Sequence, residues 1–119
     1  MENFKIEMYR RVYKYALKLI NLIDKLPRNY RSEVLGKQLL RSGTSISANL
    51  IESKSASSKK DYINFYQYAL KSANETKLWL ALIRDTNQNI KAESEALIKE
   101  TMEIGNILAA SILTMKKKK

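Results

Sequence analysis

The chain has 119 residues, a length that fits one domain with a single hydrophobic core. It contains one proline, three glycines and neither cysteine nor histidine, which excludes a disulfide framework, a thiolate metal site and catalysis by a histidine base. Its 22 basic residues outnumber 12 acidic residues, and the resulting net charge of +10 favours a polyanionic partner.

The first predicted helix covers residues 4–26 and ends before Pro27, because proline disfavours the helical conformation of the residue before it. Its apolar residues alternate steps of four and three, which is the pattern of a helix in a bundle. They are Phe4, Met8, Val12, Tyr15, Leu19, Leu22 and Leu26.

A second apolar strip lies beside this pattern and widens the apolar face to about half of the helix circumference. Its residues are Tyr9, Tyr13, Ala16, Ile20 and Ile23. Tyrosine is enriched at protein interfaces, so the strip predicts a subunit interface. The alternative is that the tyrosines only shield the edge of the bundle, with their hydroxyls in water.

The second predicted helix covers residues 35–53 and is unusual because small polar residues occupy its inner positions from Ser42 to Asn49. Its predicted buried positions are Leu35, Leu39, Ser42, Ile46, Asn49 and Ser53. Small residues allow helix backbones to approach closely, and buried hydroxyl groups then need hydrogen-bond partners.

Residues 54–58 are predicted to connect this helix to the next, with Ser58 as its N-cap and Asp61 completing a capping pattern. The third predicted stripe is Tyr62, Phe65, Ala69, Ser72, Thr76, Trp79 and Ile83. Residues 85–89 are polar and predict a turn. The fourth stripe is Leu97, Thr101, Ile104, Leu108, Ser111 and Met115.

These elements predict an all-α fold, an antiparallel up-down-up-down four-helix bundle over residues 1–115 followed by a mobile basic tail at 116–119. The longest apolar runs are too short to span a membrane. The N-terminal residues do not resemble a signal peptide, and the absence of cysteine fits a reducing compartment. We therefore expect a soluble cytoplasmic protein.

The basic residues of the first helix fall within an arc of about 100°, beside the apolar stripe. This α-helical basic stripe and the lysine tail predict phosphate contacts with nucleic acid. The candidate residues are Arg10, Arg11, Lys14, Lys18, Lys25, Lys116, Lys117, Lys118 and Lys119. The alternatives are a solvated face that keeps the protein soluble and an acidic protein or membrane surface as the partner.

No motif for catalysis, a cofactor or a metal is found in the sequence. The three glycines are isolated, so no phosphate-binding loop is present. Di-iron bundles need a Glu-x-x-His pair on each of two helices, and the chain has no histidine. The carboxylates of Glu93, Glu95, Glu100 and Glu103 are expected to form a solvated face, and we predict a non-enzymatic protein without cofactor or metal.

Several motifs resemble one known family. They are Leu26-Pro27, Gln38-Leu39-x-Arg41-Ser42-x-x-Ser45-Ile46-x-x-Asn49-x-x-Glu52, Ser58-Lys59-Lys60-Asp61-Tyr62 and Ala69-x-x-Ser72-x-x-Glu75. The chain resembles the four-helix-bundle proteins encoded in intervening sequences of bacterial large-subunit ribosomal RNA genes, which are related to the accessory variability determinant of diversity-generating retroelements. Where that family usually has Asn-Ile-Ala-Glu-Gly, this chain has Asn49-Leu50-Ile51-Glu52-Ser53.

The resemblance implies a basic, barrel-like homopentamer, and in the retroelement branch it implies binding to a reverse transcriptase and nucleic acid. The motif also predicts a buried polar network between the second and third helices, formed by Arg41, Asn49, Glu52 and Glu75, that sets helix register. Direct contact of these residues with a ligand or RNA is the alternative. The predicted function is nucleic-acid binding by an oligomeric accessory protein; the alternative is a protein–protein scaffold without a nucleic-acid partner.

Overall fold

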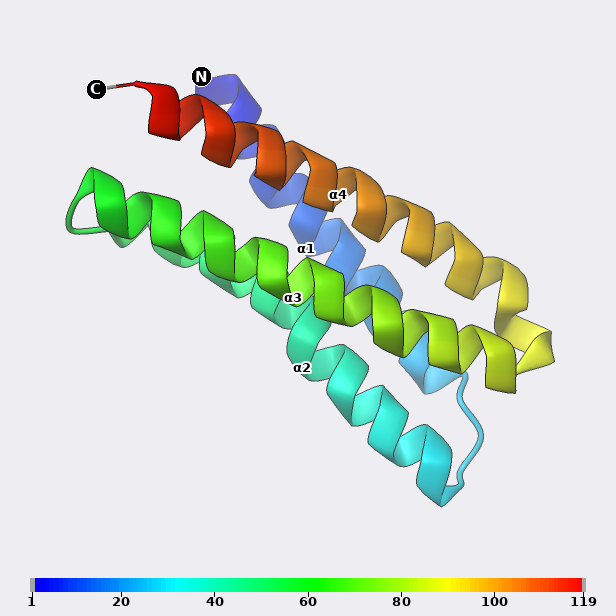
Figure 1. The fold of residues 1–119 in the computed structure, drawn as a ribbon. Helices are drawn as coiled ribbons and strands as arrows, with labels where there is room; N and C mark the ends of the chain where they lie inside the picture. Colours follow the sequence, from blue (N-terminus) through cyan, green and yellow to red (C-terminus); the bar gives the residue numbers. More distant parts are fainter. Residues whose placement is uncertain (1, 119) are drawn as a thin grey trace.

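The computed structural model describes residues 2–118, which form four α-helices and two short 3-10 helices. Their bounds are α1 (Glu2–Asp24), α2 (Tyr30–Glu52), η1 (Ser53–Ser55), α3 (Lys59–Thr86), η2 (Gln88–Ile90) and α4 (Lys91–Lys117). Successive α-helices run antiparallel in an elongated bundle of 50 × 22 × 20 Å, with both chain termini at one end (Figure 1). The predicted all-α four-helix bundle is confirmed. Within residues 2–118, no helix combines the length and apolar character needed to cross a bilayer.

Polar side chains cap the helices that follow the first two connections. The side-chain oxygen of Asn29 accepts a hydrogen bond of 2.8 Å from the Ser32 N–H at the start of α2. The predicted N-cap at Ser58 is confirmed, because its hydroxyl oxygen accepts a 3.0 Å hydrogen bond from the Asp61 N–H. The Asp61 carboxylate in turn accepts from the N–H of Ser57, one residue earlier than a capping box requires.

Helix α2 begins at Tyr30, five residues earlier than predicted, and two further boundaries also differ. The turn expected at residues 85–89 is shorter, because α3 continues through Thr86, whose hydroxyl donates to the Leu82 carbonyl oxygen at 2.7 Å. The predicted mobile tail is partly helical: α4 includes Lys116 and Lys117. Cations in the last turn of a helix interact favourably with its unpaired carbonyl groups, which supports this extension.

The predicted stripe of α1 forms one wall of the core, where Met8, Val12, Tyr15, Leu19 and Leu22 are all buried. Phe4 is 44% exposed, so the buried stripe begins one turn later than predicted. Leu26 is partly buried and packs against the core.

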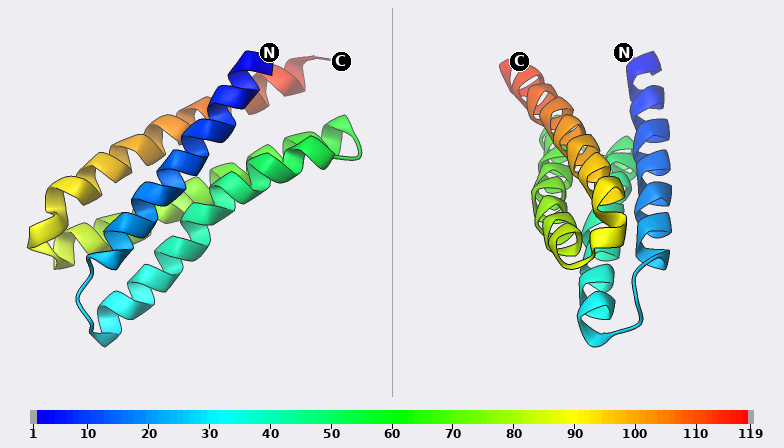
Figure 2. Two further views of the ribbon diagram at one scale, coloured as in Figure 1. Left: turned by 180° about the vertical axis from the view of Figure 1, so that it is seen from behind. Right: turned by 90° about the vertical axis from the view of Figure 1, so that its right-hand side faces the viewer.

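The stripe of α3 is rotated from the predicted one. Of the predicted residues, Ala69, Thr76 and Ile83 are buried as expected. Phe65, Ser72 and Trp79 are only half-buried, and Tyr66, Ala73 and Leu80 are buried instead. Helix α3 packs extensively against both α2 and α4, so its buried face points between those two helices. Helix α1 packs mainly against α2 and less against α4, and α1 and α4 diverge toward the chain termini (Figure 2).

The small polar residues of α2 satisfy most of their hydrogen-bonding groups within their own helix. The hydroxyls of Thr44 and Ser45 donate to the Leu40 and Arg41 carbonyl oxygens at 2.6 and 2.8 Å. One bond crosses to another helix: the buried hydroxyl of Thr76 donates to the Ser42 hydroxyl oxygen at 2.9 Å. Hydrogen bonds to carbonyl oxygens of the preceding turn therefore offset the free-energy cost of removing these polar side chains from water.

Gly43 allows α1 and α2 to pack closely. A Cβ atom at this position would overlap Cδ1 of Leu19, a side chain that is fully buried. Gly105 of α4 differs, since a Cβ there would lie 3.8 Å from Cδ1 of Leu70, an ordinary contact. A glycine in α2 at this position therefore contributes to packing although it lowers helix propensity.

We expect Gly43→Ala to lower the free energy of unfolding by up to about 2 kcal/mol, because an overpacking cost of about 1–3 kcal/mol outweighs the ~1 kcal/mol that alanine gains in helix propensity. Gly105→Ala is the matched control and should raise the free energy by about 0.5–1 kcal/mol. Urea unfolding followed by far-ultraviolet circular dichroism measures both. Stabilisation of equal size by the two substitutions would contradict the close approach at Gly43.

Candidate nucleic-acid interface

Two members of the predicted basic stripe pair with acidic residues of α4. Arg11 makes a bidentate contact with Glu100, at 2.8 Å from Nε and 2.7 Å from Nη2, and a 3.0 Å contact with Glu103. Lys25 contacts both carboxylate oxygens of Glu93 at 2.8 Å. These pairs connect α1 and the residue after it to α4 along one side of the bundle. They also neutralise two positive charges that would otherwise be available to bind phosphate.

The remaining cations of the α1 stripe stay available. Arg10, Lys14 and Lys18 are exposed and have no ion pair within residues 2–118. The Arg11 hydrogen bonds lower the pKa of Glu100, and the charge of Lys18 contributes a smaller effect in the same direction. The structure therefore divides the predicted stripe into two paired side chains and three free ones. We call Arg10, Lys14 and Lys18 the free basic stripe.

The C-terminal lysines lie at the end of the bundle that carries both termini. Lys116 and Lys117 are exposed in the last turn of α4, and the main-chain carbonyl of Lys118 accepts a hydrogen bond from Nζ of Lys59. Lys119 lies outside the described residues. The described part of the tail is thus anchored to the start of α3.

The predicted interface strip of α1 divides into an inner and an outer part. Tyr9, Ala16 and Ile23 are half-buried; Nζ of Lys54 lies 4.2 Å from the ring centroid of Tyr9, and Ile23 packs near Gly36 of α2. Tyr13 and Ile20 are 63% and 38% exposed. Of the five residues in the predicted interface strip, Tyr13 and Ile20 are therefore the exposed ones.

Other exposed apolar residues were missed by the sequence analysis. Ile6 and Leu17 of α1 are 44% and 46% exposed, and Leu40 and Ile51 of α2 are also exposed. A shallow groove lined by Tyr13, Ile51 and small residues of α2 separates the two helices. The spacing of Ile6, Tyr13, Leu17 and Ile20 by seven, four and three residues could have revealed this surface. We call Ile6, Tyr13, Leu17, Ile20, Leu40 and Ile51 the outer apolar strip.

Two of the four residues expected in the polar network meet. Arg41 of α2 forms an ion pair with Glu75 of α3, and it also donates to the Gln38 side-chain oxygen at 2.8 and 3.0 Å. Trp79 Nε1 donates to the same Glu75 carboxylate at 3.3 Å. The Arg41 hydrogen bond lowers the pKa of Glu75.

The other two network residues lie outside this cluster. The Asn49 amide donates to the Ser45 carbonyl oxygen at 2.8 Å, and exposed Glu52 has no hydrogen bond or ion pair within residues 2–118. The Arg41 and Glu75 side chains are 54% and 35% exposed, so the expected buried network is a surface pair. Helix back-bonding satisfies Asn49 locally, and it therefore needs no partner across the helices.

The Arg11 contact also predicts a pH dependence of stability. Its hydrogen bonds lower the pKa of Glu100 below the ordinary value of 4.5, although burial acts in the opposite direction. A carboxyl with a depressed pKa in the folded state stabilises the fold above its unfolded-state pKa, and this stabilisation is lost as pH falls through the folded-state value. We expect the free energy of unfolding to fall below pH 4.5, and to fall less steeply in Glu100→Gln.

Chemical unfolding on both sides of this pH measures the difference. Glu95→Gln is the matched control, because exposed Glu95 lies on the same helix and has no ion pair within residues 2–118. Identical pH profiles for Glu100→Gln and Glu95→Gln would show that the Arg11–Glu100 pair does not stabilise the fold.

Comparisons with known proteins agree with this architecture. The chain is 35% identical to a Bacteroides thetaiotaomicron protein of unknown function from the S23 ribosomal protein family, whose crystal structure superposes with a TM-score of 0.82. The similarity covers 91% of this chain and 96% of that one. The comparison with curated proteins gives no match. Residues 5–110 match the family described as 23S rRNA-intervening sequence protein, and the chain therefore belongs to that family.

Proposed function

We propose that the protein is a non-enzymatic, homo-oligomeric protein that binds RNA or DNA through phosphate contacts. The observation that carries this proposal is the free basic stripe, whose Arg10, Lys14 and Lys18 remain exposed and unpaired within residues 2–118 after Arg11 and Lys25 have paired with α4. Phosphate neutralisation by such cations releases condensed counterions, which provides affinity without base readout. The net charge of +10 and the association of the family with an rRNA intervening sequence support the same partner class.

Self-association is the second part of the proposal. The outer apolar strip places six apolar side chains on neighbouring faces of α1 and α2, and exposed apolar patches of this kind mark interaction sites. We assign a second copy of the chain to this surface, and the family resemblance described above implies a pentamer. Repetition of the free basic stripe by symmetry would join weak phosphate contacts into one multivalent surface.

The same apolar strip supports the alternative function, a protein–protein scaffold without nucleic acid. The resemblance to retroelement proteins implies a reverse transcriptase as a partner. Such an enzyme would be one candidate partner of the scaffold. Neither matched family names a retroelement protein, so the proposal rests on nucleic acid and self-association. Binding to RNA would place the protein in the cytoplasm, where a chain without cysteine suits the reducing conditions.

The first test is the salt dependence of nucleic-acid binding. We expect a labelled single-stranded RNA to bind at ~50 mM salt and to lose affinity by orders of magnitude at ~200 mM, measured by fluorescence anisotropy. The triple variant Arg10→Gln, Lys14→Gln, Lys18→Gln should bind about tenfold more weakly, with a shallower salt slope. Arg11 stays intact because its replacement would also disrupt the contact with α4.

A matched triple variant controls for net charge. Lys37→Gln, Lys71→Gln and Lys99→Gln remove the same charge from exposed positions outside the free basic stripe. This variant should stay within a few-fold of wild type. Equal loss of affinity in both triple variants would show that only net charge matters, and absence of wild-type binding at ~50 mM salt would favour the scaffold function.

The second test concerns self-association. Tyr13→Glu combined with Ile20→Glu should shift the mass in light scattering toward the monomer while helicity is retained, because charges would be buried at a contact between copies. Tyr68→Glu combined with Leu78→Glu places the same charges on exposed positions of α3 and is the control. A monomeric wild type at tens of micromolar would contradict the assignment of the strip to a second copy.

A further inference from the structure

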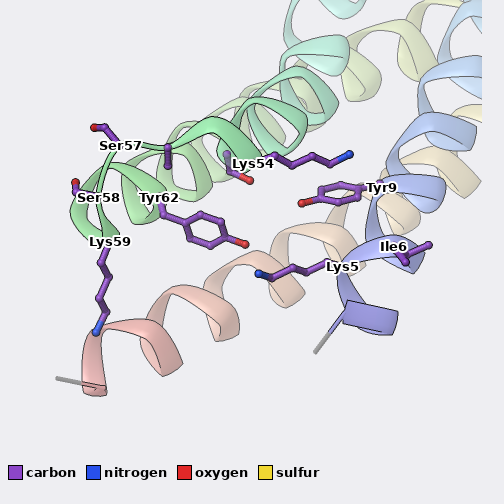
Figure 3. Close-up of a pocket in the computed structure, with 10 residues that line it drawn as sticks. Lys5, Ile6, Tyr9, Lys54, Ser57, Ser58, Lys59 and Tyr62 are labelled. Carbon is purple, nitrogen blue, oxygen red and sulfur yellow. The ribbon is translucent and has the colours of Figure 1, made fainter.

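An open pocket of about 760 Å³ lies at the end of the bundle that carries both termini (Figure 3). Residues from the start of α1, from the η1 connection and from the start of α3 line it. Its volume falls in the range of ligand pockets, which run from roughly 300 to 1,000 Å³, and so exceeds what a bare ion needs. We call it the end pocket.

Three lysines from three elements line the end pocket: Lys5 of α1, Lys54 of η1 and Lys59 of α3. None of them has a carboxylate partner among the described side chains of residues 3–118. Nζ of Lys54 lies 4.2 Å from the ring centroid of Tyr9, and Nζ of Lys5 lies 5.2 Å from that of Tyr62. Aromatic faces attract these cations but do not neutralise their charge.

The acidic group in the first turn of α3 is already engaged. The carboxylate of Asp61 accepts hydrogen bonds from the N–H and the hydroxyl of Ser57, at 3.0 and 3.3 Å, as part of the cap of α3. Lys59 donates to the Lys118 carbonyl, and Lys116 and Lys117 extend the positive charge at this end of the bundle. An anion in the end pocket would therefore reduce repulsion among several cations at once.

The Tyr62 hydroxyl adds a directional donor. It lies 3.2 Å from the hydroxyl of Tyr66, which is buried, and this burial followed by the hydrogen bond to Tyr62 raises the pKa of Tyr66. Either hydroxyl can donate in this contact, and when Tyr66 is the donor the proton of Tyr62 is left for an acceptor in the pocket. In Figure 3 the side chains of Tyr62 and Lys5 extend toward each other, and Nζ of Lys5 lies 5.2 Å from the centroid of the Tyr62 ring. An ammonium and a hydroxyl donor side by side suit a phosphate group.

We propose that the end pocket binds a phosphate group of a nucleic acid, held by Lys5 and Lys54 with the Tyr62 hydroxyl as a third donor. This inference rests on the proposed function and adds a built site at the end of the bundle to the free basic stripe on its side. The size of the pocket leaves room for the sugar attached to that phosphate. The phosphate is either an internal one or one at a chain end, since both offer the same oxygens.

The test compares Lys5→Gln combined with Lys54→Gln against Lys71→Gln combined with Lys99→Gln, which removes the same charge from exposed positions outside the pocket. With the labelled single-stranded RNA at ~50 mM salt, the pocket variant should bind about tenfold more weakly than wild type, and the control should stay within about twofold. Parallel measurements with 5′-phosphorylated and 5′-hydroxyl RNA identify the source of the phosphate. Loss confined to the phosphorylated RNA assigns the site to a terminal phosphate, and equal loss assigns it to the backbone.

A second measurement separates the failure of this inference from that of the proposed function. Inorganic phosphate is titrated into the isotope-labelled protein at constant ionic strength, with chloride as the compensating ion, and amide resonances are followed by nuclear magnetic resonance. The amides of Ser57, Ser58 and Tyr62 should shift in wild type and remain unchanged in the pocket variant. If wild type does not bind RNA at all, the proposed function fails and this titration alone decides the site. If RNA binds but the pocket and control variants bind it equally, the inference fails while the proposed function stands.

Discussion

The close contact between Leu19 of α1 and Gly43 of α2 sets the arrangement on which the other surfaces depend. A side chain at residue 43 would force Leu19 or the two helices to shift, because Leu19 is fully buried in a closely packed core. With Leu19 seated there, the periodicity of α1 directs Arg11 toward α4, Ile23 toward α2 and Tyr9 toward Lys54 of η1. Lys25, just after α1, also pairs with α4. The rotation of α1 thereby determines which of its residues remain on the surface.

Charge in this protein is divided between structural and available groups. Three acidic residues of α4, Glu93, Glu100 and Glu103, pair with Lys25 and Arg11, and Glu75 of α3 pairs with Arg41. These contacts are partly exposed, so their contribution to stability is modest and their clearer effect is to orient neighbouring helices. Pairing of this kind leaves Arg10, Lys14 and Lys18 on one side of the bundle and the lysines of the end pocket at its terminus without acidic partners in the described chain.

The three surfaces would act together in the proposed function. The outer apolar strip and the free basic stripe both belong to the exposed side of α1, so copies that meet through the strip would bring their basic stripes into a repeated array. The end pocket lies at the end where the connection between α2 and α3 meets the N-terminal turn of α1. A polyanion that follows such an array would pass from the side of one bundle to its end, where a single phosphate can be held more closely than on an open face.

Local patterns in the sequence were sufficient to predict most of the secondary structure of this protein. Apolar periodicity predicted four helices and the buried face of α1, Pro27 predicted the end of α1, and Ser58 predicted the start of α3. These features depend on residues within one or two turns of each other, where intrinsic propensity and capping act directly. The polar composition of residues 85–89 was misleading because the Thr86 hydroxyl bonds back to its own helix.

Features that depend on how the helices rotate against each other required the tertiary structure. The stripe of α3 turned toward Tyr66, Ala73 and Leu80 because α3 packs against two neighbours, and a helical pattern does not state how many neighbours a helix has. The sequence places Arg10 and Arg11 side by side, yet only packing against α4 pairs one of them and leaves its neighbour free. Lys5, Lys54 and Lys59 lie far apart along the chain, and only the antiparallel return of the helices brings them around one pocket. Local chemistry thus determined the elements, whereas the distribution of charge between pairs and open surface was decided by contacts between helices.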